Sequence, residues 1–157
     1  MRAGVFFFFG MRYNRYNGSG TSGAELEDVR KKRMKIMVID GNSILNRAYF
    51  GIRNLSNHEG TPTNAVYGFL STLFKQEDEE KPDRIVVCFD VKEKTFRHKK
   101  FDFYKATRKP MEENLAVQLP IIKEVLDALG IVRCEMAGYE ADDLLGTISR
   151  RANEHGD

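Results

Sequence analysis

Short apolar runs alternate along the chain with longer segments in which apolar residues recur every three or four positions. Runs of strand length predict three β-strands, at 35–41, 84–90 and 131–136. The second run is apolar almost throughout, as is typical of a strand that is buried on both faces. Apolar residues at helical spacing predict helices that begin at 42 or 43 and that span 65–74, 115–129 and 141–152.

This alternation predicts an α/β fold with a parallel sheet covered on both faces, because right-handed crossovers join parallel strands. Gly130 is expected to end the helix before the third strand, and Pro120 to begin that helix or kink it. The last helix runs out at 155–157, where the pattern predicts a fourth strand that the sequence does not contain. We therefore expect residues 34–157 to be the N-terminal part of a domain, truncated before its fourth strand.

Residues 1–33 differ in kind from the rest of the chain. An aromatic run at 6–9 is followed by a segment rich in Asn, Gly and Ser at 14–23 and by a basic cluster at 30–33. A basic start before a short apolar segment suits a signal peptide, but no small-residue cleavage site follows promptly. We expect a disordered leader instead, or translated upstream sequence with Met34 as the natural start.

The composition is that of an ordinary globular domain, with 41% hydrophobic and 31% charged residues. No apolar run approaches the length needed to cross a membrane, so no membrane partner is expected. Cys88 and Cys134 lie in separate apolar runs without the spacing of metal ligands. We interpret them as reduced core residues of a cytoplasmic protein.

Five carboxylates occupy positions that the predicted topology would bring together. Asp40 and Asp90 end the first two strands, and Glu140, Asp142 and Asp143 open the last helix at the same edge of the sheet. Ligands bind at this edge in open parallel sheets. Ordinary structural roles compete with this interpretation, because Asp-Gly suits a hairpin turn and acidic residues stabilise a first helical turn. Clustered carboxylates nevertheless repel one another unless a hard cation neutralises them, which favours Mg²⁺ or Mn²⁺.

Positive charge is concentrated at 91–110, although the net charge of the whole chain is only +2. Eight Lys and Arg residues stand there against two acidic residues, a net charge of +6, with aromatic residues between them. A solvated charged loop is the ordinary interpretation of such a run. Basic residues mixed with aromatic ones beside a carboxylate site favour a nucleic-acid backbone instead. The candidate contacts are Arg47, Arg97, Lys99, Lys100, Tyr104, Lys105, Arg108 and Lys109.

Three blocks of the sequence, in order, resemble the 5′ nuclease domain of the bacterial DNA polymerase I family. The first block comprises Met37–Gly41, Asn46–Tyr49 and Ala65–Phe69. The second comprises Phe89–Lys92, Thr95–Arg97 and Tyr104-Lys105-x-x-Arg108, and the third is Gly138–Asp143. The resemblance covers 34–157, and the three blocks together are highly specific.

The resemblance implies a three-layer, flap-endonuclease-like fold related to PIN nucleases, with a mainly parallel sheet. It implies two Mg²⁺ or Mn²⁺ ions held by the five carboxylates, with Tyr104, Lys105 and Arg108 as catalytic residues. Arg47 and Arg97 would also lie near the scissile phosphate. The implied reaction is phosphodiester hydrolysis at DNA 5′ ends, 5′ flaps and RNA primer–DNA junctions, in replication and repair in the bacterial cytoplasm.

The sequence departs from the family after the last helix. In the family, a fourth strand with further aspartates for the second metal, a helix–three-turn–helix element that grips duplex DNA and a polymerase portion follow. The resemblance therefore implies one well-held ion and weak or no cleavage by this chain.

A non-catalytic DNA-binding module stays open as an alternative. An RNA-directed PIN nuclease also stays open, although the Tyr104-Lys105-x-x-Arg108 block favours the polymerase-linked branch. A nucleotide-binding protein is disfavoured, because no Gly-rich phosphate loop follows the first strand.

Overall fold

The computed structural model of the chain describes residues 6–12, 33–101, 103–105, 107 and 110–154. They contain one four-stranded sheet with the strands in the order β1-β2-β3-β4. Its strands are β1 (Phe6–Arg12), β2 (Arg33–Asp40), β3 (Arg84–Cys88) and β4 (Val132–Cys134). β2, β3 and β4 are parallel, whereas β1 runs antiparallel to β2. The predicted parallel sheet is therefore confirmed.

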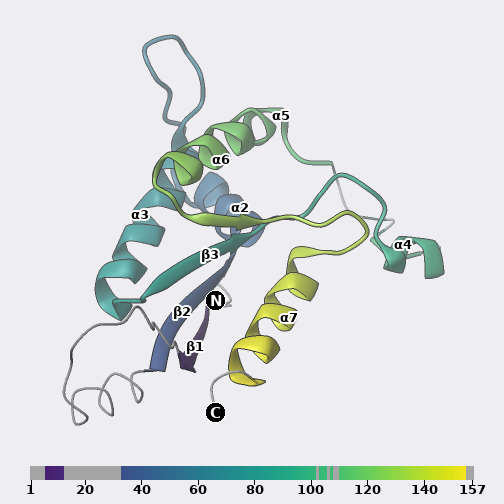
Figure 1. Ribbon diagram of the computed structural model, residues 1–157. Coiled ribbons are helices and arrows are strands. Elements are labelled where there is room, and N and C mark those ends of the chain that lie inside the picture. Colours follow the sequence, from purple (N-terminus) through teal and green to yellow (C-terminus); the bar gives the residue numbers. More distant parts are fainter. Residues whose placement is uncertain (1–5, 13–32, 102, 106, 108–109, 155–157) are drawn as a thin grey trace.

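Helices cover both faces of this sheet (Figure 1). They are α2 (Gly41–Gly51), α3 (Asn64–Glu80), α4 (Phe96–Lys100), α5 (Glu113–Ala116), α6 (Gln118–Ala128) and α7 (Ala141–Glu154). One outer layer contains α2, α3 and α6, and the other contains α7, which packs across β1, β2 and β3. The fold is thus the three-layer α/β arrangement that the sequence predicts. Because α2 and α7 each follow a parallel strand, both begin at the carboxyl edge of the sheet.

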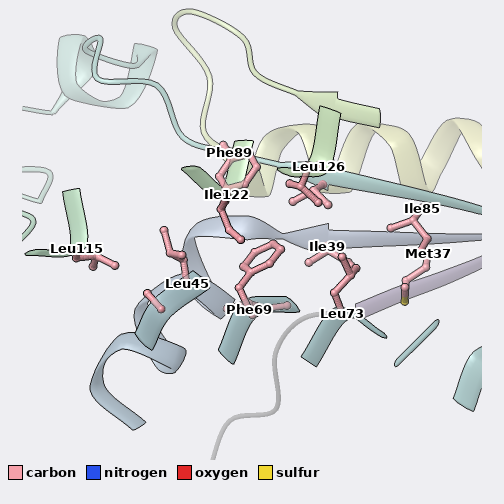
Figure 2. Close-up of a cluster of buried hydrophobic side chains, with 13 residues drawn as sticks. Met37, Ile39, Leu45, Phe69, Leu73, Ile85, Phe89, Leu115, Ile122 and Leu126 are labelled. Carbon is pink, nitrogen blue, oxygen red and sulfur yellow. The ribbon is translucent and has the colours of Figure 1, made fainter. Parts of the chain in front are cut away.

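The larger buried cluster lies between the sheet and α2, α3 and α6 (Figure 2). Met37 and Ile39 of β2 belong to it, whereas Val38 between them packs in the cluster beneath α7. This is the alternation of faces expected along a strand. Phe69 of α3 stacks on Phe89, with ring centroids 6.4 Å apart and ring planes 17° apart. β2, which ends at the candidate acid Asp40, is consequently packed on both faces by apolar contacts.

Gly41 allows the start of α2 to pack closely on the end of β3. A Cβ atom at this position would collide with the ring of Phe89. Because Asp40 precedes Gly41 and Asp90 follows Phe89, this contact also brings the two aspartate-bearing segments together. A larger residue at position 41 would push them apart.

The smaller buried cluster joins β2 and β3 to α7. Val38 and Cys88 from the sheet pack against Leu144 and Leu145 of α7. Burial raises the pKa of the Cys88 thiol to about 12, so the thiol is protonated at neutral pH. Cys88 and Cys134 are both free, and Cys88 is buried in the core as expected, whereas Cys134 is only half-buried.

Several helices differ from the predicted pattern. α3 continues through the acidic residues to Glu80 and ends at Lys81, whose backbone is left-handed with φ 46°. The helix predicted at 115–129 is divided at Val117 into α5 and α6, and Pro120 lies in the first turn of α6, where its missing N–H is tolerated. α4 was not predicted, because its sequence has no apolar stripe. Within the described residues, no helix is both long and apolar enough to span a membrane.

The segment expected to be a disordered leader contains a strand. Residues 6–12 pair with 33–39 in a continuous antiparallel register, from Phe6 beside Ile39 to Arg12 beside Arg33. The structure thus differs from the expectation for these seven residues, whereas the rest of 1–32 lies outside the described residues. The physical reason is that β2 would otherwise expose an edge of unpaired N–H and C=O groups.

Candidate active site

Two of the candidate acids act as caps at the carboxyl edge of the sheet. Asp40 caps α2, its Oδ1 accepting the backbone N–H of Ser43 at 2.9 Å. Asp90 follows β3, and its Oδ1 accepts the backbone N–H of Ala141, at the start of α7, at 2.8 Å. The backbone N–H of Asp90 donates to Oδ1 of Asn42 at 3.2 Å. These bonds join the strand ends to the helix starts. Asp40-Gly41 begins a helix, so the hairpin turn considered for this pair is wrong.

A cavity of about 360 Å³ lies at this edge. Four of the five predicted metal ligands line it, namely Asp40, Asp90, Glu140 and Asp142. The other lining residues are Asn42, Ser43, Asn46, Arg47, Lys105 and Ala141. Sequence reasoning did not identify the polar side chains at 42, 43 and 46 as site residues. Their place in the first turns of a helix that begins directly after Asp40 is the signal that could have found them.

The carboxylates that line the cavity repel one another. Burial raises the pKa of Asp40 above its ordinary value, and the charges of Asp142 and Asp90 raise it further. The backbone N–H of Ser43 partly offsets this rise by hydrogen bonding to the ionised form. Concentrated negative charge of this kind favours a bound cation.

Glu140 is the most buried of the acids and is already neutralised by donors. Only 6% of the residue is exposed. Its carboxylate accepts hydrogen bonds from the Tyr104 hydroxyl at 2.8 Å, from Nζ of Lys105 at 3.0 Å and from Nη1 of Arg97 at 3.5 Å. Burial alone would raise the pKa of Glu140, but the bonds from Lys105 and Tyr104 outweigh it, and the pKa is lowered. The carboxylate is therefore ionised and held by protein cations.

Asp143 is engaged by Arg97 rather than by the cavity. Both of its oxygens accept from the Arg97 guanidinium, each at 2.6 Å, and Oδ2 also accepts the backbone N–H of Glu140 at 3.0 Å. The bond from Arg97 lowers the pKa of Asp143, and the same pair raises the pKa of Arg97. Asp143 is not among the residues that line the cavity. Here it accepts from Arg97 and from the backbone at the start of α7, and its role as a metal ligand stays a prediction.

The described acids do not form a complete metal site in this conformation. No three of the described His, Cys, Asp and Glu residues lie close enough together to hold an ion. The hard oxygen donors of Asp40, Asp90 and Asp142 suit Mg²⁺ or Mn²⁺. An ion bound to these residues would compete with Lys105 for Glu140.

The predicted basic residues fall into three groups. Arg47 and Lys105 line the cavity, and Lys105 holds a left-handed backbone with φ 55°. Arg97 and Tyr104 contact the acids directly. Lys99 and Lys100 lie exposed on α4, away from these contacts. The predicted contacts Arg108 and Lys109 lie outside the described residues.

Known proteins and a known family resemble this chain in sequence. Residues 35–157 match the family described as 5′-3′ exonuclease, N-terminal resolvase-like domain. The chain is 45% identical over 115 residues to DNA polymerase I of Caldicellulosiruptor bescii, 45% identical over 125 residues to that of Bacillus subtilis, and 42% identical over 122 residues to a thermostable DNA polymerase I of Thermus thermophilus. These matches cover 73%, 80% and 78% of the chain, but only 14%, 14% and 15% of the respective relatives.

The match begins at residue 35, within β2, and it includes the acids at the carboxyl edge of the sheet. The resemblance noted from the three sequence blocks is therefore confirmed. The chain belongs to the 5′-3′ exonuclease family, of which it matches the N-terminal, resolvase-like domain, and it is similar to part of DNA polymerase I.

Proposed function

We propose that the chain carries the substrate-binding face and one metal position of a divalent-metal-dependent phosphodiesterase. Its substrates would be DNA 5′ ends, 5′ flaps and RNA primer–DNA junctions. The observation that supports this proposal most directly is the cavity, in which four carboxylates lie together with Arg47 and Lys105. A cluster of acidic side chains alone would suit cation binding, and basic side chains alone would suit phosphate binding without catalysis. The combination of the two suits metal-dependent hydrolysis of a phosphodiester.

The donor set fits a hard divalent ion. Asp40, Asp90 and Asp142 would hold it, together with Glu140 once Lys105 has been displaced from that carboxylate. A bound ion would supply charge neutralisation and a water of lowered pKa. The like charges that raise the pKa of Asp40 would then be compensated.

The residues around the cavity have separate tasks in this proposal. Arg47 and Lys105 would bind non-bridging oxygens of the scissile phosphate, because both line the cavity. Arg97 would keep Asp143 and the start of α7 in place through its bidentate contact. Tyr104 would orient Glu140 by donating its hydroxyl proton in a hydrogen bond. The left-handed backbone of Lys105 costs about 1 kcal/mol or more, and strain of this kind is common at functional sites.

We further propose that cleavage by this chain alone is slow. Asp143 is the one predicted metal ligand that does not line the cavity, and both of its oxygens accept from Arg97, which leaves a second ion with no ligand of its own among the predicted acids. Two-metal hydrolysis stabilises the attacking and the leaving oxygen with separate ions. Loss of one preorganised electrostatic group typically costs about 100- to 1000-fold in rate.

The test is a single-turnover assay with a 5′-flap DNA, the 157-residue chain in excess and Mn²⁺ present. We expect slow, Mn²⁺-dependent hydrolysis that the Asp90→Asn substitution abolishes. Asparagine keeps an oxygen that can accept the Ala141 N–H, so the variant should fold. The matched control is Glu59→Gln, which changes an exposed loop residue that does not line the cavity. This variant should cleave the flap at the rate of the wild type.

Binding of the flap without Mn²⁺-dependent cleavage, even at long times, would contradict the catalytic proposal and favour the DNA-binding module. One observation favours the non-catalytic DNA-binding module. Glu140 and Asp143 are already paired with Lys and Arg side chains of the protein, rather than being left for a metal ion. Failure to bind the flap at all would contradict both. Equal cleavage by wild type and Asp90→Asn would show that the hydrolysis does not come from this site.

A further inference from the structure

Two exposed aromatic side chains contact each other beside the acidic residues. Phe96 begins α4 and Tyr139 lies just before α7, and their ring centroids are 5.8 Å apart with an angle of 56° between the planes. Phe96 remains 44% exposed and Tyr139 47% exposed. Each ring therefore keeps part of its apolar surface exposed to solvent. A planar group that stacked on this exposed surface would be stabilised by burying it.

The backbone fixes this pair next to the acid–base contacts. The N–H of Phe96 donates to the carbonyl of Gly138 at 2.9 Å, which joins the start of α4 to the loop before α7. Arg97, the next residue, contacts Asp143, and Glu140 directly follows Tyr139. The same two short segments thus carry both the aromatic pair and the contacts of the site.

The surroundings of the pair favour a polynucleotide over an apolar peptide. α4 carries four consecutive basic or titratable residues after Phe96, from Arg97 to Lys100. The Arg97 guanidinium lies 4.7 Å from the centre of the Phe96 ring. Exposed rings interleaved with cations are the arrangement that binds single-stranded nucleic acid, the rings stacking on bases and the cations contacting phosphates.

We propose that Phe96 and Tyr139 form a stacking platform for an unpaired base of the DNA strand whose backbone enters the cavity. This inference rests on the proposed function. Because the rings are inclined at 56°, a base that stacks on one ring meets the other near its edge. Stacking accepts any base, so the platform would hold a frayed end without sequence preference. It would position a neighbouring phosphate beside Glu140 and Lys105.

The test measures the affinity of a single-stranded oligonucleotide in EDTA, by fluorescence anisotropy, with one abasic site moved stepwise along the strand. For the wild type we expect binding to weaken about fivefold or more when the abasic site reaches the platform. Phe96→Leu and Tyr139→Leu should bind the intact strand more weakly and lose this dependence on position. Both should keep the salt dependence of binding, because the phosphate contacts remain.

Phe50→Leu is the matched control. Phe50 is 72% exposed and also contacts a neighbouring ring, that of Tyr49 at 5.0 Å, but it lies near the end of α2 that is opposite Asp40. This variant should retain the abasic profile of the wild type. Phe96→Tyr, which keeps an aromatic ring, should retain it as well.

A measurement on the wild type alone covers the case in which a leucine variant does not fold. An oligonucleotide with 2-aminopurine at the sensitive position should lose fluorescence on binding, as stacked 2-aminopurine does. Absence of quenching at every position, or a flat abasic profile in a wild type that binds DNA, would overturn the platform and leave the nuclease proposal intact. Absence of any DNA binding would overturn both.

Discussion

Asp40 has two roles that substitution can separate. Its side chain caps α2 by accepting the Ser43 N–H, and its charge adds to the repulsion around the cavity. The pKa of Asp40 is raised in the folded state, so ionisation is disfavoured there relative to the unfolded chain. The raised pKa therefore lowers the free energy of unfolding. This loss of stability is absent at a pH below the pKa of Asp40 in the unfolded chain, grows as the pH rises from that pKa to the raised pKa of the folded state, and is constant above it.

We therefore expect Asp40→Asn to be more stable than the wild type at neutral pH. Asparagine is an equally good helix cap and removes the repelled charge. The difference should vanish at a pH below the unfolded carboxyl pKa, where aspartate is neutral in both states. Asp40→Ala, which loses both the cap and the charge, should cost about 1 kcal/mol in acid and less at neutral pH, where loss of the repelled charge partly offsets loss of the cap. Urea unfolding at neutral and acidic pH measures these differences, and a gain for Asp40→Asn that persists in acid would contradict the electrostatic explanation.

Lys105 and a divalent ion should compete for Glu140. Lys105→Met removes the cation that donates to Glu140 at 3.0 Å, so Mn²⁺ should bind more tightly and raise the melting temperature by a larger amount. Lys94→Met removes an equal charge from an exposed residue of the same basic segment and controls for long-range repulsion. Calorimetric titration with Mn²⁺ compares the two variants. Equal affinities would show that the contact between Lys105 and Glu140 does not limit metal binding.

At the level of residues, the sequence predicts the place of the acids better than their partners. Strand ends and helix starts are determined by local patterns, so the gathering of Asp40, Asp90, Glu140 and Asp142 at one edge follows from the topology. The direction of the Asp143 side chain depends on Arg97, which is 46 residues away in sequence. No local pattern contains that information, because the approach of α4 to α7 is a property of the folded chain.

At the level of elements, apolar periodicity predicts the buried elements and misses those with little apolar surface. β2, β3 and α7 bury their apolar residues against neighbours and were predicted close to their observed positions. α4 has no buried residue and is held instead by a cap, in which the Thr95 hydroxyl lies 2.7 Å from Nδ1 of His98. β1 pairs through its backbone, which composition alone does not reveal.

The pairing of β1 gives a prediction opposite to that from composition. If residues 1–33 were a disordered leader, as their composition suggested, deleting them would leave thermal stability unchanged. The register between β1 and β2 predicts instead that deleting residues 1–12 exposes the β2 edge and lowers stability, by an amount of order 1–3 kcal/mol. Deleting only residues 1–5 is the control and should have no effect. Thermal melting and light scattering measure stability and association, and an unchanged melting temperature for the longer deletion would show that β1 contributes little.

At the level of the whole molecule, the placement of α7 determines where a further parallel strand could join the sheet. From β2 to β4 the sheet grows in one direction, with α2, α3 and α6 on one face, whereas α7 follows β4 on the opposite face. A right-handed crossover over that second face leads back past β2. A strand that followed α7 would therefore lie beside β2, where β1 now pairs.

Since the family that the sequence resembles has such a strand, we predict that a longer version of this chain which carries it will release β1. Hydrogen exchange of the backbone amides at 6–12 measures this, with slow exchange expected in the 157-residue chain and fast exchange in the longer one. The amides of β2 should be protected in both, because one partner replaces the other. Protection of 6–12 that persists in the longer chain would show that the two strands do not share the β2 edge, and that the crossover takes another path.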